Sequence, residues 1–235
     1  MMDNVAASGV RWAGVAGLGM LALVVVFGIG GSLVVGAGDP PSGTTDAATL
    51  RDYYGRAALG PLSAWAPLGA VLGLLFFLGA REAWGKNPTG HRAATMALVL
   101  FAAATPAFLV EGALVPAMVE AVKAGSDIGT WFRFYDVLYN SYLDIIMGGA
   151  VLFLSWALWA AEPRHAWQAR AGFVIAGLHA AIAITPWFAL PSVVRAVAML
   201  LFSIWFGSLC VSLIRLPSAN VHDMATSAGA PRARA

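Results

Sequence analysis

Charge and cysteine are both scarce in this sequence. Only 11% of the 235 residues are charged, against roughly 25% in a soluble domain, and the mean hydropathy of +0.76 points the same way. An ordinary soluble domain is therefore excluded. The single cysteine, Cys210, cannot form an internal disulfide, and we expect it to pack as a small hydrophobic side chain. A basic helix is also missing, which excludes nucleic-acid binding.

Motifs that would fix a reaction are absent as well. The sequence has no GxSxG turn, no Walker A loop and no Rossmann glycine pattern. No lysine lies within a predicted helix, which excludes a retinal Schiff base. Of the four histidines, only His179 falls within a predicted span, and the HxxxH and ExxH patterns of membrane metal sites are missing. We therefore expect no metal and no cofactor.

Long apolar runs make up most of the chain. Six of them fall at 13–37, 62–80, 93–119, 137–161, 171–190 and 194–214. Each is close to or above the ~20 residues that cross a hydrocarbon core, and the first is longer than the ~7–15 residues of a signal-peptide core. Period-2 alternation is absent, so the spans are predicted to be helices.

These runs define the predicted architecture, an all-α polytopic membrane protein. A six-helix transmembrane domain at 13–215 is expected between an N-terminal segment at 1–12 and a disordered tail at 216–235. The connection 38–61 is the longest, and it contains a segment at 46–54 that can form one short outer-loop helix capped by Thr45 or Asp46. Tyr53 and Tyr54 at its end favour a position along the membrane interface.

The orientation follows from the Lys and Arg residues, which favour cytoplasmic loops. Nine of the 14 lie on the side that holds both termini. Both termini are therefore predicted to be cytoplasmic, with the chain crossing the inner (plasma) membrane several times. The Ala-rich composition, with more Arg than Lys, suggests a bacterial source.

Small residues and tryptophans predict how the helices pack and where they end. Gly69 and Gly73 form a GxxxG pair, which favours close packing inside the bundle or, alternatively, a homodimer. Tryptophans near the predicted helix ends are interpreted as interfacial anchors; they are Trp12, Trp84, Trp159, Trp167 and Trp187.

Acidic residues inside the apolar runs are the best functional clue. Glu111 and Asp144 lie in the third and fourth predicted spans, where a carboxylate is costly unless it serves a site or a specific pairing. Asp136, Asn140 and Asp144 follow one another at intervals of four residues, so they share one face of a regular α-helix. We expect that face to point to protein or to a water-filled cavity.

The two carboxyl groups are predicted to lie at similar depth. Counting 1.5 Å per residue places Asp144 roughly 10 Å and Glu111 roughly 12 Å below the outer boundary. Consecutive antiparallel helices are usually neighbours, so we expect a shared polar pocket in the outer half of the bundle. His179, mid-way along the fifth span, and Arg195, at the start of the sixth, are expected to join this pocket.

Three functions fit this pocket. The first is binding or moving a small molecule or lipid. The second is a membrane-embedded isomerase or cyclase, in which Glu111 or Asp144 protonates an apolar substrate, because burial favours the protonated carboxyl group. The third is an accessory subunit of a membrane complex, in which the polar residues merely bond one another and hold the helices together.

Overall fold

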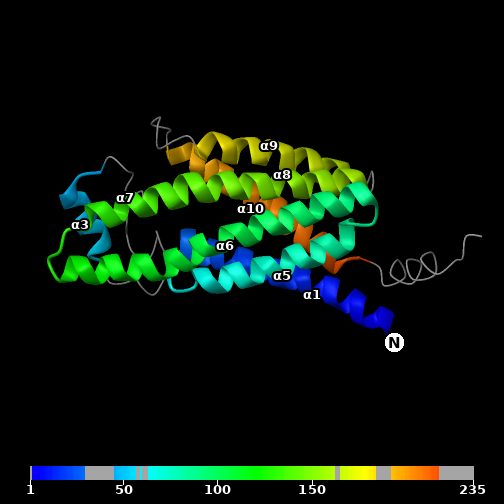
Figure 1. Ribbon diagram of the computed structural model, residues 1–235, viewed down its shortest axis with the longest axis horizontal. Coiled ribbons are helices and arrows are strands. Elements are labelled where there is room, and N and C mark those ends of the chain that lie inside the picture. The colour runs from blue at the N-terminus through cyan, green and yellow to red at the C-terminus, as the bar shows by residue number, and fades with distance from the viewer. Residues whose placement is uncertain are drawn as a thin grey trace, which may run out of the picture.

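The computed structural model describes residues 2–29, 45–56, 59, 63–161, 165–183 and 192–216. Its long helices run roughly along one common axis (Figure 1). The elements, all helical, are α1 (Met2–Leu23), π-helical η1 (Val24–Ile29), α3 (Ala47–Tyr54), α5 (Ala66–Trp84), α6 (Pro88–Lys123), α7 (Gly129–Val137), π-helical η2 (Leu138–Leu143), α8 (Asp144–Ala161), α9 (Ala166–Ala183) and α10 (Ser192–Ile214).

Five helical runs are long and apolar enough to cross a membrane. They are Ser8–Val26, Ala66–Trp84, Pro88–Lys123, Gly129–Ala161 and Val197–Ile214. The prediction of an all-helical, multi-pass membrane protein is confirmed at this level. The predicted count of six is not, because the fifth predicted span corresponds to α9, which is not among these runs. Gln168, Arg170 and His179 lower the hydropathy of α9, and 184–190 lie outside the described residues.

Two helices, α3 and α6, begin at residues whose side chains cap them. Asn87 accepts a hydrogen bond from the Gly90 backbone N–H at 2.7 Å and precedes Pro88, so α6 starts with a satisfied amide and a fixed φ. The Asn87 side chain also donates to the Ala160 carbonyl at 2.6 Å, which ties the α5–α6 turn to the end of α8. At α3, Asp46 accepts from Ala48 and Thr49. A helix therefore forms where the sequence predicts one, while its placement on the outer side stays a prediction.

Small residues bring α1 into close contact with α5 and α10. A Cβ built on Gly17 would lie 2.6 Å from both Cys210 Sγ and a ring carbon of Phe76. Cys210 is fully buried there, as expected for a small hydrophobic side chain. Tight backbone approach is how membrane helices gain packing energy without a hydrophobic driving force.

The GxxxG pair of α5 divides between two environments. A Cβ on Gly73 would lie 2.6 Å from a ring carbon of Phe101 and 3.0 Å from Met20 Sδ. Gly73 therefore packs inside the bundle, against α6 and α1. A Cβ on Gly69 would have no atom of the described residues within 4 Å, so one glycine of the pair serves internal packing and the other faces open space.

One predicted interfacial anchor is wrong. Trp84 is only 2% exposed and its Nε1 has no hydrogen-bond partner among the described residues. Its ring meets the His165 ring, with centroids 6.0 Å apart and planes at 65°. Trp12, Trp159 and Trp167 are more than half exposed, as an anchor must be. Trp187 and the predicted tail beyond 216 lie outside the described residues.

The first and last helices meet at one end of the bundle. Arg11 Nη2 donates to the Leu216 carbonyl at 3.4 Å, and Figure 1 shows the start of α1 and the end of α10 at the same end. The short helix α3 lies at the opposite end, beside the turn from α6 to α7 (Figure 1).

Candidate functional site

A π-helical segment, η2, lies between the acidic residues of the fourth predicted span. It covers Leu138–Leu143 and separates Asp136 in α7 from Asp144 at the start of α8. A π-helix closes i→i+5 hydrogen bonds and so holds more residues per turn than an α-helix. The prediction that Asp136, Asn140 and Asp144 share a regular α-helical face is therefore wrong in its geometry. Such bulges are frequent at functional sites.

Asp144 is paired with His179. Asp144 Oδ1 lies 2.8 Å from His179 Nδ1, and the Asp144 and His179 side chains are 19% and 7% exposed. The pair joins the start of α8 to α9. Both residues were predicted to lie in the pocket, but not to bond each other. An ionised carboxylate can only accept, so a neutral imidazole bonded to one carries its proton on Nδ1.

The second imidazole nitrogen of His179 is buried without a partner. Nε2 makes no hydrogen bond with any described residue, and His179 as a whole is 5% exposed. The edge of the ring meets Phe202 of α10, with ring centroids 5.7 Å apart and planes at 90°. In that neutral tautomer Nε2 is a hydrogen-bond acceptor, and no described residue donates to it.

Glu111 lies among tyrosines. Its charge acts on Tyr54, Tyr135 and Tyr139, and Tyr135 and Tyr139 are stacked with centroids 5.5 Å apart. Asp144 also interacts electrostatically with Tyr139. Tyr139 of η2 thus lies within electrostatic range of both carboxyl groups and connects Glu111 to Asp144.

The short helix α3 closes this region from the end of the bundle. Tyr54 is buried and meets Phe132 of α7 with ring centroids 6.0 Å apart. Burial raises the pKa of Tyr54, and the neighbouring Tyr53, Asp136 and Glu111 raise it further. Asp136 itself is 6% exposed. We call the group formed by Glu111, Tyr135, Asp136, Tyr139, Asp144 and His179 the acid–tyrosine cluster.

The remaining predicted members are placed only by their backbone. Asn140 lies in η2, and Arg195 lies in the first turn of α10; their side chains are outside the described part of the structure. Their participation stays a prediction. Within the described residues, no group of three or more His, Cys, Asp or Glu side chains is placed to hold a metal ion.

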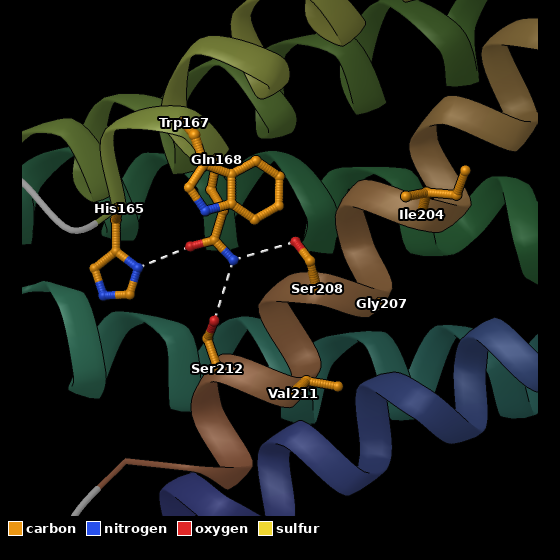
Figure 2. A pocket seen from close by; sticks show the side chains of 8 residues that line it. All are labelled: His165, Trp167, Gln168, Ile204, Gly207, Ser208, Val211 and Ser212. Atoms are coloured by element: carbon orange, nitrogen blue, oxygen red, sulfur yellow. Dashed lines mark hydrogen bonds between the residues drawn. The ribbon is translucent and has the colours of Figure 1, made fainter.

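A second polar cluster, which was not predicted, lies near the start of α9. It is roughly 16 Å from His179, counted at 1.5 Å per residue. Gln168 is 3% exposed; its Nε2 donates to Ser208 and Ser212 Oγ, each at 3.1 Å, and its Oε1 lies 2.8 Å from His165 Nδ1. Figure 2 shows these side chains spanning the space between α9 and α10. The sequence feature that could have predicted this cluster is the pair Ser208 and Ser212, which lie one helical turn apart in an apolar run.

The fold and these two clusters define a class: a multi-pass α-helical membrane protein with buried polar groups inside its bundle. Comparison with models of known families, with curated proteins and with solved structures finds no match for the chain.

Proposed function

We propose that this protein binds a small amphipathic molecule, a lipid or a lipid-like metabolite, in the outer half of its bundle and holds the polar end of that molecule in the acid–tyrosine cluster. The observation that carries the proposal is the buried, unpartnered Nε2 of His179, held in one tautomer by Asp144. A buried acceptor left unsatisfied costs about 1–3 kcal/mol. A ligand hydroxyl or N–H that donates to Nε2 removes this cost.

The surroundings of His179 support an amphipathic ligand. Tyrosines offer hydroxyl groups that both donate and accept, and Glu111 supplies a carboxyl group near Tyr135 and Tyr139. Exposed apolar side chains flank the cluster on the same helices, including Val137 and Ile145, which are 57% and 60% exposed. A molecule entering from lipid therefore meets an apolar surface first and the polar groups next.

We also propose the topology of the bundle: α9 crosses the membrane as a sixth span, and both termini face the cytoplasm of a bacterial inner membrane. The hydrogen bond from Arg11 to Leu216 supports this proposal, because an even number of spans returns the last helix to the side of the first. The three polar residues of α9 have polar or aromatic neighbours, which reduces their cost in lipid: Gln168, Arg170 over the Trp159 ring, and His179.

The purely structural function is the second candidate, because the Asp144–His179 bond by itself holds α8 against α9. Two variants separate the candidates. His179→Asn places an amide N–H near the position of Nδ1, so the bond to Asp144 is retained while Nε2 is removed. Asp144→Asn weakens the pair itself. Ligand binding depends on Nε2, whereas a structural role depends on the bond.

The experiment is native mass spectrometry with lipid analysis of the detergent-purified protein. We expect a molecule that co-purifies with the wild type and is lost from Glu111→Gln, Asp144→Asn and His179→Asn. Matched controls are Glu120→Gln and His91→Asn, whose residues are exposed and lie outside the cluster; both must retain the molecule. Unchanged molecular content in His179→Asn, with a lower melting temperature only in Asp144→Asn, would establish the structural role instead.

A further inference from the structure

The second polar cluster lines a groove between α9 and α10. Its volume is about 590 Å³, and it is lined by His165, Trp167, Gln168, Ile204, Gly207, Ser208, Val211 and Ser212 (Figure 2). It opens sideways, because Trp167 and Ile204 at its rim are 56% and 62% exposed. With α9 crossing the membrane as proposed above, on which this inference rests, a sideways opening faces the lipid.

The groove changes character along its length. Ser212, Gln168 and His165 lie at one end, where α9 begins and α10 ends, while Ile204 lies about two turns deeper on α10 (Figure 2). Polar groups at the helix ends and apolar groups toward the middle of the bundle reproduce the order of a phospholipid, whose head lies at the membrane surface. Trp167 at the polar end fits the level of the head groups.

A positive charge lies beside the polar end. Arg215 is exposed and follows Val211 by four residues, with its backbone N–H bonded to the Val211 carbonyl at 3.0 Å. It therefore lies one turn beyond Val211, on the same side of α10. A guanidinium at this level matches the phosphate of a lipid head group in charge and geometry.

The floor of the groove is glycine and serine. Gly207 lines the groove, and a Cβ built on it would lie 3.3 Å from Leu21 Cδ2 of α1. Gln168 Nε2 donates its two hydrogens to Ser208 and Ser212. The Ser208 hydroxyl in turn donates to the Trp205 carbonyl at 2.6 Å. These hydrogen bonds fix the polar floor without a ligand. The Ser212 hydroxyl accepts from Gln168, and a hydroxyl can also donate its own hydrogen to a ligand oxygen.

We propose that this groove is a binding site for one glycerophospholipid of the adjacent leaflet, with its phosphate at Arg215, its glycerol region at Ser212 and one acyl chain along Val211, Gly207 and Ile204. The site is separate from the acid–tyrosine cluster. It recognises the lipid by its phosphate and by the acyl chain together, so neither a free phosphate nor a neutral diacylglycerol satisfies both ends.

The test uses the full-length, delipidated protein in detergent, titrated with phosphatidylglycerol and followed by native mass spectrometry. Val211→Trp fills the groove from an already exposed position, and Val197→Trp is the matched control, an exposed valine on the same helix outside the groove. We expect wild type and Val197→Trp to bind one lipid alike. Val211→Trp is expected to bind about tenfold more weakly, since displacing roughly two methylene groups has that effect.

Two further measurements decide the chemistry of the ligand. Glycerol 3-phosphate and diacylglycerol, titrated separately, are each expected to compete poorly with phosphatidylglycerol. Arg215→Gln is expected to lower the preference for phosphatidylglycerol over diacylglycerol without preventing diacylglycerol association. Equal lipid binding by Val211→Trp and Val197→Trp would overturn the proposal. Competition by glycerol 3-phosphate alone would overturn it in favour of a soluble phosphate ligand, and the ligand of the acid–tyrosine cluster would be unaffected in each case.

Discussion

His179 shows what a single residue discloses in sequence and what it does not. Its position in an apolar run marked it as a member of the polar pocket. Its partner, Asp144, lies 35 residues earlier, and no local spacing connects a residue of α8 with one of α9. The sequence also gives no sign that Nε2 lacks a hydrogen-bond partner among the described residues, because this depends on the orientation of the imidazole ring.

Gly73 and Gly69 carry the clearest prediction at the scale of one residue. Gly73→Leu forces a side chain into the space of Phe101 and Met20, so it is expected to lower the free energy of unfolding by about 1–3 kcal/mol. Gly69→Leu meets open space and also removes a helix-interior glycine. It is expected to leave stability unchanged or slightly higher.

Melting temperatures of the two glycine variants in the same detergent check this expectation. Gly69→Leu is the control, because it makes the same substitution four residues away on the same helix. Equal losses in both variants would contradict the internal packing of Gly73. A change of oligomeric state in Gly69→Leu alone would instead revive the homodimer through the exposed half of the motif.

At the scale of helices, composition and hydropathy were strong guides. Apolar runs predicted the long helices, and Asp46 was one of the two caps predicted for the short helix α3. The Asn87 cap of α6 was not predicted, since the third apolar run was expected to start at residue 93. The π-helical turn of η2 was out of reach, since nothing in Leu138–Leu143 distinguishes it from α-helix by composition. That turn is why counting α-helical faces placed Asp136, Asn140 and Asp144 wrongly. The Gln168 cluster was missed because α9 was judged by its apolar part alone.

The cap of α3 gives a prediction at the same scale. Asp46 accepts from the Ala48 and Thr49 amides and from the Thr49 hydroxyl at 2.8–3.0 Å. Asp46→Ala leaves these donors unsatisfied. We expect faster hydrogen–deuterium exchange of the α3 amides, while Asp46→Asn, which keeps an acceptor oxygen, exchanges more slowly than Asp46→Ala.

The same cap must respond to acid. Hydrogen bonds from Thr49 hold the pKa of Asp46 below its ordinary value of 3.8. A lowered folded-state pKa means that the contribution of Asp46 is complete above pH 3.8 and is lost as the pH falls through the folded-state value. Asp52→Ala is the control: Asp52 lies on the same helix but is exposed, and its ion pair at 2.9 Å is with Arg56, just beyond the helix end, so little change in exchange is expected. Equal exchange in Asp46→Ala and wild type would contradict the capping role.

For the whole molecule, the decisive question is whether α9 crosses the membrane. Six spans place the first and last residues on one side, and five place them on opposite sides. The contact between Arg11 and Leu216 requires that the ends of α1 and α10 lie together. Five crossings would separate these ends by the thickness of a bilayer, about 30 Å, so the contact favours the proposed even number of spans.

Single cysteines labelled by a membrane-impermeant thiol reagent on intact cells test this topology. The native Cys210 is buried, so background labelling is expected to be low. We introduce Asn4→Cys and Ser227→Cys near the two termini, Lys86→Cys in the predicted inner loop and Ser126→Cys in the predicted outer loop. Only Ser126→Cys is expected to react in intact cells, and all four should react once the membrane is permeabilised. Reaction of both Ser227→Cys and Ser126→Cys in intact cells would show an odd number of crossings. In that case α9 would not cross the membrane, and its polar face would have to lie along the membrane surface instead of inside the bundle.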